Sequence, residues 1–208
     1  KELEINPECK FHRYNDSNQT NEADTVNDID CWQLFCQELR KNHPHLNSLS
    51  IYCKTSDKDL SYLIDHAISP AGLTDPNSNT PSTVLPIQAL FFSKFCSCDE
   101  KSLLALSRVL NSASGQNWRS LSISRGVKLP SQSSLDDGLP LPPRPTDRHG
   151  LLEFCRSLQY ATALTKLTMG DFIFDEFEMG ALFESLVLAS GKIEKLSLFD
   201  SATTSNQV

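Results

Sequence analysis

Residues 193–198 read IEKLSL and residues 164–169 read LTKLTM, two hexamers with the same pattern. Large apolar residues occupy the first, fourth and sixth positions, and polar residues fall mainly between them. The pattern occurs three more times, as LNSLSI at 46–51, IQALFF at 87–92 and WRSLSI at 118–123. Five occurrences in a chain of 208 residues indicate an internal repeat.

The segments between the hexamers have the periodicity of amphipathic helices. Their apolar stripes are Trp32, Phe35, Cys36, Leu39; Leu60, Leu63, Ile64, Ala67, Ile68; Leu103, Leu106, Val109, Leu110; Leu151, Leu152, Cys155, Leu158; and Met179, Leu182, Phe183, Leu186. Ser56 with Asp59 resembles a capping box, and Asp99 and Asp175 are expected to cap two later helices. The alternation of strand and helix predicts an α/β protein with a parallel sheet.

Two architectures fit this alternation: a compact doubly wound fold and a solenoid of stacked strand–helix units. Strands of a doubly wound sheet are buried on both faces and are therefore continuously apolar. The hexamers instead interleave Ser, Lys and Thr with the apolar residues. One face of the sheet is therefore expected to meet solvent, which favours the solenoid.

At these hexamers the chain resembles the leucine-rich repeat family, in particular the helix-containing class typified by ribonuclease inhibitor. The resemblance covers residues 31 to 200 and rests on an L-x-x-L-x-L strand core. Its members are Leu46/Leu49/Ile51, Ile87/Leu90/Phe92, Trp118/Leu121/Ile123, Leu164/Leu167/Met169 and Ile193/Leu196/Leu198. It implies a short horseshoe with the parallel sheet on its concave face and helices on its convex face.

The repeats depart from the family pattern in two ways. Successive hexamers start 41, 31, 46 and 29 residues apart, and only the last spacing is regular for this class. The family has Asn or Cys three residues after the sixth position, where its side chain hydrogen-bonds the backbone. In this chain other residues occupy that position. They are Lys54, Phe95, Gly126, Phe172 and Ser201. Irregular loops are expected after the strands.

We expect a repeat domain of about five units over residues 31–208. Two stretches rich in Pro, Ser, Asn and Asp, at 69–86 and 128–150, are interpreted as long loops inserted into it. Residues 1–30 are polar and acidic, and are expected to be partly mobile or to cap the domain. Because the chain does not begin with Met, further domains of a larger protein are expected.

The composition of the chain restricts which classes of partner and which cellular compartment are expected. With 19 Lys and Arg against 26 Asp and Glu, the net charge of -7 disfavours nucleic acid. No apolar run approaches the roughly 18 residues that span a bilayer. Seven cysteines, an odd number without a secretory signal, favour reduced thiols in the cytoplasm or nucleus. Glycosylation sequons at Asn15 and Asn18 leave an extracellular recognition domain as an alternative.

Motifs of catalysis and metal binding are not found. There is no phosphate-binding loop, nucleophile elbow or zinc-protease motif, and the close pairs His43/His45 and Cys96/Cys98 lack a second pair at zinc-site spacing. We therefore expect no catalytic residue, metal or cofactor. The alternative is an α/β hydrolytic enzyme in which a cysteine and a histidine, such as Cys155 and His149, meet in space.

The predicted concave face is the candidate binding surface. Its residues alternate with the apolar core residues along each strand. Those expected to bind a partner are Tyr52, Phe91, Ser120, Ser122, Lys166, Thr168, Lys195, Ser197 and Phe199. Lys166 and Lys195 would lie on adjacent strands about 5 Å apart. The aromatic residues are of the kind that anchors interfaces.

The sequence thus predicts a non-enzymatic protein–protein interaction module, a recognition or scaffold domain of a larger intracellular protein. The partner itself is not indicated. The family resemblance implies several settings: the ligand-sensing ends of NOD-like receptors of innate immunity, substrate recognition in cullin ubiquitin ligases, and regulation of small GTPases. A shared fold does not choose among them.

Overall fold

The main sheet has six parallel strands that follow one another in space as they do in the chain. The computed structural model describes residues 2–5, 31–69, 85–125, 149–189, 192–199 and 201–203. Within them the strand order is β1-β2-β3-β4-β5-β7. The strands are β1 (Glu2–Ile5), β2 (Ser48–Ile51), β3 (Ala89–Phe92), β4 (Ser120–Ser124), β5 (Lys166–Gly170) and β7 (Lys195–Phe199).

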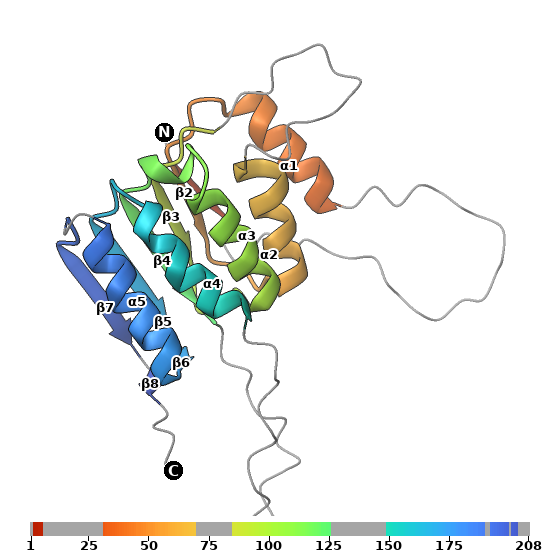
Figure 1. The fold of residues 1–208 in the computed structure, drawn as a ribbon. Coiled ribbons are helices and arrows are strands. Elements are labelled where there is room, and N and C mark those ends of the chain that lie inside the picture. The colour runs from red at the N-terminus through yellow and green to blue at the C-terminus, as the bar shows by residue number, and fades with distance from the viewer. Residues whose placement is uncertain are drawn as a thin grey trace, which may run out of the picture.

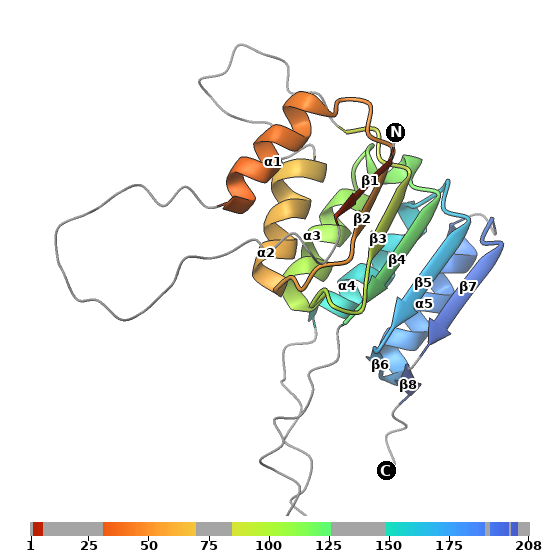
Figure 2. The same ribbon diagram turned by 180° about the vertical axis from the view of Figure 1, so that it is seen from behind.

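Helices cover one face of this sheet (Figure 1). They are α1 (Cys31–Asn42), α2 (Asp57–Leu63) with a π-helical continuation (Ile64–Ile68), α3 (Glu100–Leu110), α4 (His149–Ser157) and α5 (Glu176–Leu188). Figure 2 shows the opposite face, which no described helix covers. The predicted α/β class with a parallel sheet is confirmed. None of the described helices is long and apolar enough to cross a bilayer.

Each of the five hexamers contains a strand that begins at its third residue. In the first four hexamers the first, fourth and sixth residues are all buried between the sheet and the helices. Pairing places equivalent positions side by side, so the fourth residues form one buried row. That row is Leu49, Leu90, Leu121, Leu167 and Leu196. Only its last member, Leu196, is exposed.

Three short strands were not predicted. Strand β1 lies in the polar first 30 residues and pairs with β2, with Glu2 opposite Ser48. Strands β6 (Ile173–Phe174) and β8 (Ala202–Thr203) form a separate two-stranded sheet beyond the ends of β5 and β7. Residues 6–30 and most of the two predicted loops, at 70–84 and 126–148, lie outside the described residues.

The predicted helix caps are confirmed at two of three positions. Ser56 Oγ accepts a hydrogen bond from Asp59 N–H at 3.2 Å and caps α2. Asp175 and Glu178 form a reciprocal capping box at α5. Asp99 stands at the N-cap position of α3, but its side chain does not cap the helix.

The start of α3 is capped instead by a carboxylate from α2. Asp57 accepts hydrogen bonds from three backbone N–H groups at the start of α3, including those of Asp99 and Ser102, at distances between 2.9 and 3.1 Å. At the next junction, Gly150 N–H donates to Glu100 Oε1 at 2.5 Å. Because helix N-termini have unpaired N–H groups and favour anions, these contacts tie successive helices together.

Side-chain hydrogen bonds also join the ends of successive strands. Cys96 Sγ lies 3.4 Å from Ile51 O and 3.5 Å from Cys53 O. Ser201 Oγ donates to Met169 O at 3.5 Å. The contacts with Ile51 O and Met169 O reach the sixth hexamer position of the neighbouring strand. Ser201 stands at the position where the family pattern predicts Asn or Cys, whereas Cys96 lies one residue after that position.

Candidate functional site: the open face of the sheet

The uncovered side of the six-stranded sheet, hereafter the open face, carries all nine predicted partner-binding residues. Along β2 to β5 the buried residues alternate with half-buried or exposed ones, except at the last residues of β4 and β5, Ser124 and Gly170, which are also buried. Since successive side chains of a strand point to opposite faces, the more accessible ones lie on the side of the sheet away from the helices. Figure 2 shows the strands from that side. Tyr52 and Phe199 extend this alternation at the ends of their strands.

Strand register arranges these side chains in rows across the sheet. The first row is Glu2, Ser48, Ala89, Ser120, Lys166 and Lys195. The second is Glu4, Ser50, Phe91, Ser122, Thr168 and Ser197. The open face therefore runs from two carboxylates at the β1 edge to two lysines at the β5 and β7 edge. Glu2 and Glu4 were not predicted to lie on this face, although their alternation with Leu3 and Ile5 is a strand signal.

Two lysines lie together at the β5 and β7 edge of the open face. Lys166 and Lys195 are register partners on adjacent strands, and both are exposed. In the described part of the chain, no carboxylate forms a salt bridge with either. Like charges directly opposite each other in a sheet are destabilising. An anionic group brought to this position is therefore favoured.

Aromatic side chains stand on both sides of the hydroxyl-bearing centre. The rings of Tyr52 and Phe91 contact each other with centroids 5.1 Å apart and an angle of 36° between their planes. Phe199 is 41% exposed, and its ring lies over Gly170, where a Cβ atom would overlap it. Gly170 thus leaves the space that this ring occupies.

Small hydroxyl side chains fill the middle of the open face. Ser50, Ser122, Thr168 and Ser197 are all half-buried members of the second row. Each hydroxyl can both donate and accept hydrogen bonds. None of them projects far from the backbone, so a protein surface can approach the sheet closely here.

A polar cluster at the end of β4 and β5 was not predicted. Ser124 Oγ donates to Asp171 Oδ2 at 2.5 Å, and Arg125 forms a 3.1 Å salt bridge with Asp99. Asp171 has a φ of 61°, in the left-handed region that Asp tolerates better than most residues. Its backbone N–H donates to Phe199 O at 3.1 Å. The cluster holds together the chain turns that follow these two strands.

Comparisons with known proteins do not assign this face. No family model, curated protein or solved structure matches the chain. The interpretation of the open face therefore rests on its own residues.

Cys155 does not have the lowered pKa that would support the alternative cysteine–histidine site. Cys155 is buried, and burial together with the charges of Glu178 and Asp175 raises its pKa to about 12. His149, by contrast, is exposed and lies 4.0 Å from Glu153. A thiol with a raised pKa stays protonated near neutral pH and is a poor nucleophile.

The buried thiols do not mark a metal centre in the described chain. Cys36, Cys53, Cys96, Cys98 and Cys155 are all buried, and none of them forms a disulfide. Burial also raises the pKa of Cys96 to about 11, which disfavours the thiolate that a metal needs. No group of three or more His, Cys, Asp or Glu within the described ranges could hold a metal ion.

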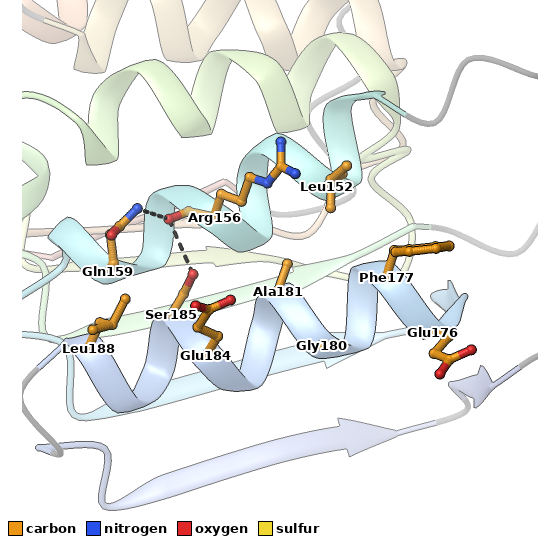
Figure 3. A pocket seen from close by; sticks show the side chains of 10 residues that line it. All are labelled: Leu152, Arg156, Gln159, Glu176, Phe177, Gly180, Ala181, Glu184, Ser185 and Leu188. Carbon is orange, nitrogen blue, oxygen red and sulfur yellow. Dashed lines mark hydrogen bonds between the residues drawn. The ribbon is translucent and has the colours of Figure 1, made fainter.

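A shallow groove lies on the helical side, between α4 and α5 (Figure 3). Arg156 lines it from α4, Gln159 from the 3-10 turn after α4 (Leu158–Tyr160), and Phe177, Glu184 and Leu188 from α5. None of the predicted partner-binding residues borders it. Its polar groups are partly occupied within the protein, since Gln159 Nε2 and Ser185 Oγ both donate to Arg156 O, at 2.9 and 3.3 Å.

Proposed function

We propose that this chain is a protein-recognition module whose open face binds a folded protein partner, and that its strand–helix units form a leucine-rich repeat solenoid. Three features support the solenoid: strands adjacent in sequence are adjacent in the sheet, the helices share one side, and equivalent hexamer positions pair with each other. In such arrays one continuous surface is available for binding.

The observation that carries the binding proposal is the composition of the open face beside β5 and β7. The exposed Lys166 and Lys195 pair stands next to the low hydroxyls of Ser122 and Thr168. The matching partner surface bears a carboxylate cluster for the lysines and a protruding apolar side chain for the aromatic pair across the sheet. Interfaces combine such complementary charge with a few aromatic anchors.

We place the module in a larger intracellular protein, as a recognition or scaffold domain of the receptor-sensing or ubiquitin-ligase type. The reduced thiols of Cys36, Cys53, Cys96, Cys98 and Cys155, none of them in a disulfide, suit a reducing compartment. The sequons at Asn15 and Asn18, on which the extracellular alternative depends, lie outside the described residues. Mass spectrometry that finds an N-glycan on either asparagine, after expression through a eukaryotic secretory pathway, would support that alternative.

The experiment compares partner capture by variants of the whole chain. Ser122→Arg places a long cationic side chain in the centre of the open face, while Gln116→Arg makes the same charge change at an exposed position away from the sheet. Proteins captured from lysate are identified by mass spectrometry, and one of them is then purified to measure its Kd.

We expect Ser122→Arg and Lys166→Glu each to weaken that purified complex at least about tenfold, because they obstruct or reverse the charge of a contact surface. Gln116→Arg should bind as the wild type does. Equal binding by all four proteins, each shown to be folded by circular dichroism, would remove the open face from the binding site.

A further inference from the structure

The two edge strands of the sheet are open in different ways. In the described chain β1 pairs only with β2, and β7 pairs only with β5, at the opposite end (Figure 2). The open-face residues of β1 are the exposed carboxylates Glu2 and Glu4. Those of β7 include the exposed Lys195. The two edges therefore have opposite charge.

The β7 edge is also apolar on its helical side. Leu196 is 37% exposed, whereas Leu167, at the equivalent position of β5, is buried. Helix α5 adds Phe183 at 50% and Val187 at 77% exposure, four residues apart and so on one side of the helix. Ser185, on another side of α5, contacts α4. The surface that an inner unit would bury against its successor is uncovered here.

The register of the sheet defines what could cover it. Each pairing step aligns the same positions, so that Glu2, Ser48, Ala89, Ser120, Lys166 and Lys195 form a single row. One further parallel step onto a copy of β1 would set Lys195 opposite Glu2 and Leu196 opposite Leu3. The half-buried Leu3 would then gain a second apolar neighbour. This step also supplies the carboxylate that the lysine pair lacks.

We propose that β7 of one copy pairs in parallel with β1 of a second copy, joining the molecules head to tail into a continuous sheet. Helix α1 follows β1 on the helical side, so the second copy's α1 comes to the side where Phe183 and Val187 are exposed. Because the two contacting edges differ, the contact is heterologous and leaves β1 and β7 free at the ends. The association does not depend on binding of another protein to the open face.

Sedimentation velocity of the whole chain, over about 1 µM to 1 mM, tests the proposal in the range where small interfaces associate. The wild type is expected to form dimers and longer species as its concentration rises. Lys195→Glu and Glu2→Lys should each weaken this association about five- to tenfold, because each places like charges opposite one another at the junction. Lys101→Glu, at an exposed position of the central helix α3, is the matched control for the charge reversal and should associate as the wild type does.

The most specific test mixes the two edge variants, Lys195→Glu and Glu2→Lys. Every junction between different variants joins a lysine to a glutamate, so association should return to within a few-fold of the wild type. Leu196→Asp, at an already exposed site, should abolish association while circular dichroism shows a folded chain. A wild type that stays monomeric to the highest concentration would overturn the proposal. Loss of association with Lys195→Glu but not with Glu2→Lys would also overturn it and indicate a two-fold β7–β7 contact instead.

Discussion

The contact between Phe199 and Gly170 shows how a single missing side chain shapes the open face. A Cβ atom at position 170 would overlap the ring of Phe199, so Gly170→Ala must push this ring aside. We expect the free energy of unfolding to fall by about 1 kcal/mol, the cost of a strained rotamer. In a Phe199→Ala background the clash is absent, and Gly170→Ala should be neutral or slightly stabilising, since Gly weakens strands. Urea unfolding of the four proteins gives the coupling; additive changes would contradict the contact.

Buried thiols give the chain a dependence on alkaline pH. Burial raises the pKa of Cys155 to about 12, above the ordinary value of about 8.5. The unfolded chain therefore loses this proton first. The contribution of the protonated Cys155 thiol to the free energy of unfolding is complete below about pH 8.5. It declines as the pH rises toward 12, by at most about 1.4 kcal/mol per pH unit for one thiol. Cys155→Ala should reduce the slope of unfolding free energy between about pH 9 and 11. An unchanged slope would show that this thiol does not contribute.

At the scale of elements, Asp57 is the most consequential link between helices. The Asp57 carboxylate accepts hydrogen bonds from three backbone N–H groups at the start of α3. Ser102 Oγ also donates a hydrogen bond to the backbone carbonyl of Asp57 at 2.9 Å. Asp57→Ala leaves those N–H groups without this acceptor and should lower the free energy of unfolding by about 1 to 2 kcal/mol. Lys58→Ala, at the exposed neighbouring position of the same helix, should change it by less than about 0.5 kcal/mol. Chemical denaturation measures both, and equal effects would argue against the cap.

The elements that could be predicted are those encoded by a pattern of adjacent residues. The hexamers located five strands because period-two burial is written in adjacent residues, and the same alternation placed the nine candidate residues on one face. Strand β1 was missed because Leu3 and Ile5 supply only two of the three apolar positions of the hexamer. The cap by Asp57 joins residues at least 42 apart, and no local signal encodes that contact. Asp99 shows the converse error: its sequence position was right, but Arg125 brings its carboxylate into a tertiary salt bridge.

At the scale of the whole molecule, the parallel sheet is a linear array with unequal ends. Each inner strand is paired on both sides, and the buried row of the fourth hexamer positions is continuous from Leu49 to Leu167. The array ends at Leu196, where burial is incomplete. In assemblies in which each unit contacts mainly its neighbours, stability is the sum of local and nearest-neighbour contributions. We therefore expect the terminal unit of the proposed solenoid, formed by α5 and β7, to open more easily than its centre.

Hydrogen exchange followed by mass spectrometry should detect this gradient. At micromolar concentration we expect the amides of β3, β4 and α3 to exchange most slowly, because opening them breaks contacts on two sides, and those of β7 and α5 to exchange faster. Raising the concentration into the range of head-to-tail association should slow exchange in β1 and β7 while leaving β3 and β4 unchanged. Leu196→Asp should remove that concentration dependence. Uniform protection along the chain would contradict a stability that depends on neighbouring units. A gradient that does not change with protein concentration would agree with that stability but contradict the head-to-tail association.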